Sequence, residues 1–334
     1  MGKIRKIGVL TSGGDAPGMN AAIRAVVRAG VYNGCQMFGI YDGYEGMING
    51  KIKRLNSKDV SNIIQRGGTI LKTARSAGFR TPEGRMRAAG QLAARGIDAL
   101  VVIGGDGSFT GAGLLVQEHG IPVVGIPGTI DNDLFGTDCT VGYDTAVNTA
   151  VEAIDKIRDT ATAHNRLFFV EVMGRDAGFI ALRSGIASGA GAILVPELKT
   201  DLEELEKYVN EVYDPQHSSG IVVVAEGDEA GGAYKIAEKV QKEHPEFDIR
   251  VSVLGHIQRG GDPSSFDREV ASRLGAAAIE ALLDDQKSIM IGIVNGKIVH
   301  VPFNKAIKNN KGLNPELLNL VRILAVHVKY SEEA

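Results

Sequence analysis

Short apolar runs, rich in β-branched residues, alternate along this chain with longer stretches in which hydrophobic positions recur at helical spacing. Apolar runs of this length predict buried strands. The predicted strands lie at 7–10, 99–103, 122–126, 167–172, 221–225 and 250–254. Strands that alternate with helices are typical of βαβ units, so the pattern predicts an α/β fold with a mostly parallel sheet.

Capping residues and turn residues mark the ends of further elements. Thr81 followed by Pro82 predicts the start of a helix, and Gly96 predicts its end. Thr200 with Glu203 forms a capping box at the start of another helix. The predicted helices span 18–29, 82–96, 141–163 and 200–213. A hairpin with an Asn-Gly turn is predicted over 291–299.

Length and charge narrow the class of protein. The 334 residues exceed what one hydrophobic core usually holds, so we expect two α/β lobes. The apolar content of 44% and the charged content of 23% are those of an ordinary globular enzyme. The net charge of −3 gives no footprint for nucleic acid or for an anionic membrane, so neither is an expected partner.

The cysteines and the N-terminal residues indicate the compartment. Cys35 and Cys139 suit a reduced compartment, and two cysteines supply neither a disulfide framework nor a metal cluster. Residues 1–10 are basic, but their apolar part is too short for a signal peptide. No stretch approaches the roughly 20 apolar residues that a membrane helix needs, so we expect a cytoplasmic protein.

Glycines and carboxylates directly follow two of the predicted strands. Gly-Gly-Asp-Gly-Ser stands at 104–108, and Pro-Gly-Thr-Ile-Asp-Asn-Asp stands at 127–133. Ligands bind open parallel sheets beyond the carboxyl ends of the strands. Glycines there let backbone N–H groups approach phosphate oxygens, one carboxylate can hold a magnesium ion, and another can accept a hydroxyl proton. This combination predicts phosphoryl transfer from a nucleotide to an alcohol.

A second Gly-Gly-Asp sequence, at 13–15, follows the first predicted strand. Two adjacent strands would then deliver glycine-rich loops to the same phosphates. Gly-Gly-Asp-Gly alone also fits a tight strand-to-helix turn with a capping carboxylate, but its pairing with the loop at 127–133 favours a phosphate site. The chain contains no Gly-x-x-x-x-Gly-Lys-Ser/Thr sequence, so it is not a P-loop enzyme.

Cationic side chains near the strand ends are candidate phosphate ligands. A lone arginine is usually a solvated surface group, but one beside strand-terminal glycines faces the ligand crevice. Several such groups would bind a dianionic phosphate and neutralise charge during transfer. The candidates are Arg75, Arg166, Arg175, Arg250, His256 and Arg259. His256 fits equally well a core histidine whose ring is hydrogen-bonded to the backbone.

Motifs over most of the chain resemble those of one enzyme family. Besides the two loops at 104–108 and 127–133, they are Thr-Ser-Gly-Gly-Asp-Ala-Pro-Gly-Met-Asn at 11–20, Met-Gly-Arg at 173–175 and Gly-His-Ile-Gln-Arg-Gly-Gly at 255–261. Together they are similar to the motifs of bacterial ATP-dependent 6-phosphofructokinases. The resemblance extends from Ile4 to about Val299 and is weaker in the C-terminal tail.

The resemblance implies a phosphofructokinase-like fold of two lobes. Each lobe would be a mostly parallel sheet flanked by helices, with the active site in the cleft between the lobes. Residues 1–141 with 258–306 would bind the nucleotide, and residues 142–257 with 307–334 would bind the sugar phosphate. The implied reaction transfers the γ-phosphoryl group of ATP to the 1-hydroxyl of D-fructose 6-phosphate in glycolysis, with Mg²⁺ as the cofactor.

The resemblance also implies roles for individual residues. Asp131 would be the general base, Thr129 and Arg175 would be further catalytic residues, and Asp106 would hold Mg²⁺. The nucleotide-binding residues would be Gly14, Arg75, Ser76, Gly105, Asp106, Gly107 and Ser108. The sugar-phosphate residues within one subunit would be Thr129, Asp131, Asp133, Met173, Gly174, Arg175, Glu226, His256 and Arg259.

Assembly and regulation follow from the same resemblance. Arg166 and Arg250 would reach the substrate of a neighbouring subunit, so a complete site would need the family's homotetramer. The arginines that match the family's effector site, where ADP activates, are Arg24, Arg28 and Arg158. At the other effector-site positions this chain departs from the family. Ser57 replaces a further arginine, Gly191 replaces a magnesium-binding glutamate, and Pro215 and His217 replace two lysines. We therefore expect weak or absent activation by ADP.

Two other functions stay open. A pyrophosphate-dependent enzyme of the same fold would carry an aspartate in place of Gly107 and a lysine in place of Gly128, and these side chains would fill the space of the α-phosphate. A non-catalytic sensor of sugar phosphates or nucleotides would have lost the base or the metal ligand. Asp106, Asp131 and Asp133 are all present, which argues against the sensor.

Overall fold

The computed structural model describes residues 4–164, 166–198, 205 and 220–324. The chain divides into two compact units. The first unit consists of Met1–Ile130, Leu134–Thr145 and Arg259–Lys311, and the second consists of Asp131–Asp133, Ala146–Gln258 and Gly312–Ala334. Neither unit is one continuous segment, because the chain passes repeatedly from one to the other. Which ligand each unit binds stays a prediction.

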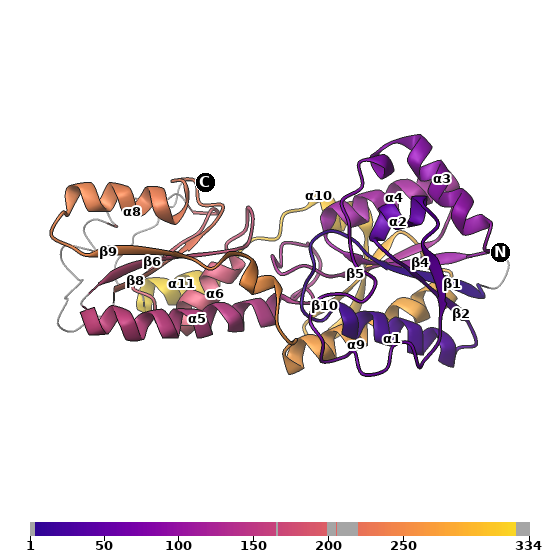
Figure 1. Cartoon of the computed structure of the whole chain (residues 1–334), viewed down its shortest axis with the longest axis horizontal. Coiled ribbons are helices and arrows are strands. Elements are labelled where there is room, and N and C mark those ends of the chain that lie inside the picture. Colours follow the sequence, from indigo (N-terminus) through magenta and orange to yellow (C-terminus); the bar gives the residue numbers. More distant parts are fainter. Residues whose placement is uncertain (1–3, 165, 199–204, 206–219, 325–334) are drawn as a thin grey trace. The chain divides into compact units, whose positions relative to one another are not determined.

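A seven-stranded sheet in the order β11-β10-β5-β4-β1-β2-β3 forms the centre of the first unit (Figure 1). Its strands are β1 (Lys6–Thr11), β2 (Gln36–Ile40), β3 (Ile52–Leu55), β4 (Ala99–Gly104), β5 (Val123–Pro127), β10 (Ile289–Val294) and β11 (Lys297–Pro302). Pairing is parallel from β10 to β2, and the two edge strands, β3 and β11, pair antiparallel. The predicted mostly parallel sheet is confirmed.

Helices cover both faces of this sheet (Figure 1). They are α1 (Met19–Tyr32), α2 (Gly43–Ile48), α3 (Pro82–Ala93), α4 (Asp106–His119), α9 (Ser265–Leu283) and α10 (Phe303–Lys308), with a 3-10 turn, η1 (Gly78–Arg80). On one face α2, α3, α4 and α10 share a core with the strand residues Leu10, Leu100 and Val102. On the other face α1 packs against α9, where a Cβ at Gly275 would lie 2.5 Å from the Cβ of Ala25.

A four-stranded parallel sheet in the order β7-β8-β6-β9 forms the centre of the second unit. Its strands are β6 (Leu167–Val172), β7 (Ala192–Leu194), β8 (Gly220–Ala225) and β9 (Ile249–Val253). One face is covered by α8 (Gly232–Glu243), and the other by α5 (Tyr143–His164), α6 (Phe179–Ala187) and α11 (Pro315–Leu324) (Figure 1). β8 is buried along its whole length, as expected for a parallel strand covered on both faces.

Most local signals for element ends are confirmed. Thr81 caps α3, which begins at Pro82 as predicted. The helix ends before Gly96, because this glycine adopts a left-handed φ of 62° in the turn that follows. Asn295 and Gly296 both have positive φ in the turn of the predicted hairpin. The helix predicted over 200–213 lies outside the described residues. Within the part of the chain that the structure describes, no helix has both the length and the hydropathy of a membrane span.

A buried carboxylate fastens the start of α5 to α9. Asp267 is fully buried and accepts hydrogen bonds from Gly142 N and Thr145 N, both at 2.8 Å, and from Thr145 Oγ1 at 2.5 Å. The first amides of a helix lack partners within the helix, so this carboxylate acts as their cap. Burial raises the pKa of Asp267 to about 6. Asp267 thereby fixes, within the first unit, the helix that follows the loop after β5.

Candidate active site

The glycine-rich loops lie at one edge of the sheet in the first unit. β1, β4 and β5 are parallel neighbours, so their carboxyl ends meet at the same edge. Backbone hydrogen bonds continue past the strand ends, from Ser12 N to Ile103 O at 2.9 Å and from Gly128 N to Gly104 O at 3.0 Å. The predicted adjacency of the two Gly-Gly-Asp sequences is confirmed.

The helix α4 begins in the loop that follows β4. Asp106 and Gly107 are exposed in its first turn. The first amides of a helix lack intrahelical partners and carry the positive end of the helix dipole, so they favour phosphate. A Cβ at Gly107 would meet no described heavy atom within 4 Å, whereas one at Gly128 would lie 2.9 Å from Ile103 Cγ2. The position of Gly107 is therefore open, and a lysine at position 128 would be crowded.

Asp106 is the predicted magnesium ligand. Its carboxylate is exposed beside the amides of the α4 N-terminus. Among the described residues, no group of three or more His, Cys, Asp or Glu side chains forms a ready-made metal cage. Mg²⁺ usually keeps several waters and binds through one or two carboxylates together with substrate phosphates. A single carboxylate next to the first amides of a helix fits this ion.

The loop after β5 carries buried polar side chains. Thr129, Asp131 and Asn132 are buried, and Asp133 is half-buried. Thr140 Oγ1 donates a hydrogen bond to Thr129 O at 2.5 Å, which fixes the start of the loop. Asn132 has a left-handed φ of 54°, a conformation that asparagine adopts more readily than most residues. Asp131 is only 3% exposed, so its interactions are weakly screened by water.

Ser76 and Arg75 lie on the segment that leads into η1. Arg75 is exposed, as a ligand-binding arginine requires. Ser76 Oγ donates a hydrogen bond to Glu45 Oε2 at 2.6 Å and accepts one from Phe79 N at 3.1 Å. The glutamate therefore fixes the position of a predicted nucleotide residue. Sequence reasoning missed Glu45, because nothing in its local sequence indicates a partner 31 positions away.

Arg259 lies against the first glycine-rich loop. Its Nη1 donates to Asp15 O at 3.3 Å, and a Cβ at Gly14 would lie 2.6 Å from the same nitrogen. The sequence predicts Arg259 as a sugar-phosphate residue and Gly14 as a nucleotide residue. The structure brings these two together within the first unit, and a Cβ at position 14 would require the guanidinium to shift.

The second unit gathers candidates at the carboxyl ends of β6 and β8. Met173, Gly174 and Arg175 follow β6, and Glu226 follows β8. Glu226 Oε1 accepts hydrogen bonds from Gly174 N at 3.2 Å and from Arg175 N at 2.7 Å. Gly174 has a φ of 148°, and a Cβ there would lie 2.3 Å from Ala177 O. Glu226 therefore holds the backbone of a turn in which position 174 requires glycine.

His256 lies in the 3-10 turn η2 (Gly255–Arg259) that follows β9. Its side chain is exposed, so the alternative of a core histidine is wrong. Gln258 in the same turn is fully buried, and its Oε1 accepts a hydrogen bond from Met173 N at 3.3 Å. This bond joins the turns after β6 and β9.

Arg166 and Arg250 share one carboxylate. They stand at the start of neighbouring parallel strands, β6 and β9. Arg166 Nε donates to Asp248 Oδ2 at 2.7 Å, and Arg250 Nη2 lies 2.8 Å from Asp248 Oδ1. The hydrogen bond from Arg166, with the charge of Arg250, lowers the pKa of Asp248 below its usual value. The two arginines are thus brought together, and Asp248 is a further residue that sequence reasoning missed.

The predicted effector residues are distributed over both units. Arg24 and Arg28 lie on α1 in the first unit, where Arg28 is exposed. Arg158 lies on α5 in the second unit, and its Nη2 donates to Ser188 O. Gly191 belongs to the segment that leads into β7. Of the remaining predicted positions, Ser57 is half-buried, and Pro215 and His217 lie outside the described residues.

Comparisons of sequence and of structure agree with one another. The family model described as Phosphofructokinase matches residues 6–282. ATP-dependent 6-phosphofructokinase 2 of Bacteroides thetaiotaomicron is 59% identical over 326 residues, which cover 98% of this chain and 100% of that protein. The structure of phosphofructokinase from Saccharomyces cerevisiae has a TM-score of 0.85 and 39% identity, and the match covers 91% of this chain but 45% of the yeast chain.

A solved structure that is named for pyrophosphate as its phosphoryl donor has the same fold. Pyrophosphate-dependent phosphofructokinase from Marinobacter aquaeolei has a TM-score of 0.80 over 99% of this chain and 94% of that one. Its sequence identity is 23%, so the likeness concerns the fold alone. The phosphofructokinase-like fold class predicted from the sequence is confirmed. On the match over residues 6–282 and the 59% identity over nearly the whole chain, the chain belongs to the phosphofructokinase family.

Proposed function

We propose that this chain transfers the γ-phosphoryl group of ATP to the 1-hydroxyl of D-fructose 6-phosphate, giving fructose 1,6-bisphosphate and ADP. The relative with 59% identity is named an ATP-dependent 6-phosphofructokinase. The observation that carries the proposal is the meeting of the loops after β1, β4 and β5 at one sheet edge, next to the α4 N-terminus. Such a kinase acts in glycolysis, and a cytoplasmic location is part of the proposal.

ATP, rather than pyrophosphate, is the donor in this proposal. The position of Gly107 is open, so nothing on the loop itself occupies the space that an α-phosphate would need. A lysine in place of Gly128, the second feature of pyrophosphate-dependent relatives, would meet Ile103 in this structure. The packing around these two glycines therefore supports ATP.

The chemistry combines a base with positioned positive charge. Asp131 accepts the proton of the 1-hydroxyl as that oxygen attacks, a role usually worth about 10²–10⁴-fold in rate. Thr129 hydrogen-bonds the group in transfer, and Arg175, beyond the end of β6, neutralises its charge. The amides of residues 105–108 at the α4 N-terminus stabilise the phosphates of the donor.

Asp106 is the residue that would hold Mg²⁺. Bound there, the ion would neutralise negative charge on the nucleotide phosphates. The exposed position of Asp106 in the first turn of α4 supports this assignment.

Asp106→Asn is expected to weaken Mg²⁺-dependent ATP binding and to lower kcat. Loss of groups that merely support metal ligands costs about 10–100-fold in affinity, so loss of a direct ligand should cost at least about tenfold. Titration calorimetry with ATP at several Mg²⁺ concentrations measures this. Asp98→Asn is the matched control, because Asp98 directly precedes β4, the strand that leads to Asp106, and its Oδ2 accepts hydrogen bonds from the backbone amides of Arg5 and Lys6. Equal Mg²⁺ dependence in Asp106→Asn and the unaltered enzyme would exclude the metal role.

The sugar-phosphate role is proposed for individual residues of this chain and for two arginines of a neighbouring subunit. Within one chain the proposal uses the exposed His256, together with Arg259 and the turn held by Glu226. Arg166 and Arg250 would complete the site of a neighbouring subunit in a homotetramer. Their common contact with Asp248 supports a joint role, because one carboxylate holds both guanidinium groups at the same sheet edge.

ADP is expected to activate this enzyme weakly or not at all. Gly191 replaces a magnesium-binding glutamate, and the lost cations would weaken diphosphate binding by about 0.5–1 kcal/mol per exposed contact. Any residual anion binding would use Arg24, Arg28 and Arg158 and would not need Mg²⁺. Initial rates at fructose 6-phosphate below its KM, with and without ADP at two Mg²⁺ concentrations, measure this. Strong activation that depends on Mg²⁺ would contradict the proposal.

A further inference from the structure

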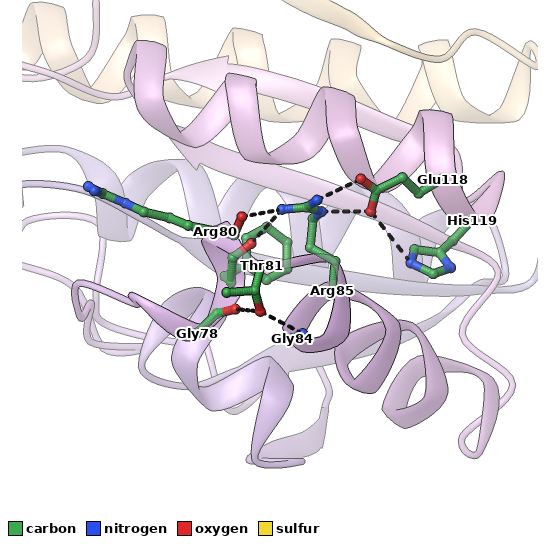
Figure 2. A network of polar contacts seen from close by, with 8 residues as sticks. Gly78, Arg80, Thr81, Gly84, Arg85, Glu118 and His119 are labelled. Atoms are coloured by element: carbon green, nitrogen blue, oxygen red, sulfur yellow. Dashed lines mark hydrogen bonds and ion pairs between the residues drawn. The ribbon is translucent and has the colours of Figure 1, made fainter.

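A buried arginine pairs with a glutamate in the last turn of α4. Arg85, in the first turn of α3, is 4% exposed. Its Nε and Nη2 donate to the two carboxylate oxygens of Glu118, each at 2.6 Å (Figure 2). The hydrogen-bonded pairing raises the pKa of Arg85 and lowers the pKa of Glu118, so both groups stay charged. Burial of an arginine is costly, and a two-point contact of this kind offsets part of that cost.

The remaining edge of the Arg85 guanidinium holds the turn η1. Its Nη1 donates to Phe79 O at 3.0 Å and to Arg80 O at 2.8 Å (Figure 2). Carbonyls at the end of a short helical turn lack hydrogen-bond donors within the turn, and Arg85 supplies a donor to both of these carbonyls. Thr81 Oγ1 accepts a hydrogen bond from Gly84 N at 3.1 Å, which closes the same turn onto α3. Arg85 therefore joins η1 to the last turn of α4.

The turn η1 is also joined to the first turn of α4. Phe79 stacks on Tyr44, with ring centroids 3.9 Å apart and an interplanar angle of 9°. Tyr44 Oη donates to Ser108 O at 2.6 Å. The segment is thus fixed to α4 at two points, one near Ser108 and one at Glu118. Two fixed points set both the distance and the orientation of η1 relative to the helix.

We propose that Arg85 and Glu118 are positioning residues for the nucleotide. Arg75 and Ser76 lie just before η1, and Ser108 lies in the glycine-rich loop, so the two fixed points set the distance between both groups of nucleotide residues. The pair acts through the backbone of η1 and not through contact with ATP. This inference rests on the nucleotide roles proposed for these residues.

The test compares the KM for ATP with the KM for fructose 6-phosphate in the Arg85→Lys variant. Lysine keeps the positive charge but has one nitrogen, which cannot bridge both Glu118 oxygens and two carbonyls. We expect the KM for ATP to rise about tenfold, as the loss of one or two charged hydrogen bonds would give. The KM for fructose 6-phosphate and kcat at saturating ATP should stay within about twofold, because η1 carries no sugar-phosphate residue. A parallel rise in both KM values, or no rise for ATP, would overturn the inference.

Arg95→Lys is the matched control. Arg95 follows α3 in the same unit, and its Nη2 donates to Gly50 O at 2.9 Å, so it also ties a segment through a carbonyl. That segment carries no predicted ligand residue. Arg95→Lys should leave the KM for ATP within about twofold while lowering thermal stability comparably. An equal rise in the KM for ATP would show a general loss of stability and overturn the proposal.

A double variant tests whether the pair acts as one unit. Glu118→Gln alone should also raise the KM for ATP, and Arg85→Lys/Glu118→Gln should be no worse than the worse single variant. Additive effects would overturn the pairing as the cause.

A further variant, Arg75→Ala, tests the nucleotide role on which this inference rests. If Arg75→Ala raises the KM for ATP and Arg85→Lys does not, only the positioning role fails, whereas no effect of Arg75→Ala overturns the nucleotide assignment and the inference with it.

Discussion

Replacement of Asp131 by serine is expected to lower kcat by at least about 10²-fold, since loss of a general base costs at least that much. Serine fits the space of the carboxylate but cannot accept a proton at neutral pH. The dissociation constant for fructose 6-phosphate should change little, because the arginines assigned to its phosphate are intact. Steady-state kinetics and titration calorimetry measure the two quantities separately.

The burial of Asp131 makes a control for folding necessary. The side chain is 3% exposed in the loop after β5, so its replacement also alters packing. Asp138→Ser is the matched control, because Asp138 lies in the following segment, is exposed and accepts a hydrogen bond from Asn295 N at 2.7 Å. The control should keep kcat within about twofold. An Asp131→Ser enzyme with more than about a tenth of the unaltered kcat would rule out general-base catalysis by this residue.

In the proposed homotetramer, mixtures of two inactive chains are expected to regain activity. One chain carries Arg250→Ala with Asp131 intact, and the other carries Asp131→Ser with Arg250 intact. If Arg250 acts in the neighbouring site, random mixing in equal amounts gives about a quarter of the sites both intact residues, since each is present with a probability of one half. Activity should therefore rise to about a quarter of that of the unaltered enzyme. Rates measured after co-refolding or co-expression, with tetramer composition checked by native mass spectrometry, give the result.

A second mixture distinguishes site sharing from general stabilisation. Here one chain carries Asp131→Ser and the other carries Asp106→Asn. Both residues are assigned to the site of their own chain, so every site keeps one defect and the mixed tetramers should contain no intact site. Only the Arg250 mixture should regain activity. Mixed tetramers that form without rescue in the Arg250 mixture would place this arginine in its own subunit's site or outside any site. Rescue in both mixtures would indicate exchange or refolding of the chains and not a shared site.

The sequence was most informative where a signal is local. Apolar runs of β-branched residues located β1, β4 and β5, and the glycines and aspartates after them located the loops at their carboxyl ends. The Thr81–Pro82 start of α3 and the Asn-Gly hairpin were also predicted correctly. These features depend on residues within a few positions of one another, where capping, turn geometry and strand burial act directly. The strands β2 and β3 and the helix α2 carried no such signal and were not predicted.

The sequence by itself therefore determined the α/β class, the loops that hold the candidate chemistry and, through its motifs, the family. The tertiary structure alone decided which distant groups support those loops. Arg85 with Glu118, Glu226 with the turn at Gly174, and Arg259 with Gly14 are pairs of this kind. Their members lie 33, 52 and about 245 positions apart. Spacing along the chain does not encode such contacts, because they arise only when packed strands and helices bring the two groups to the same place.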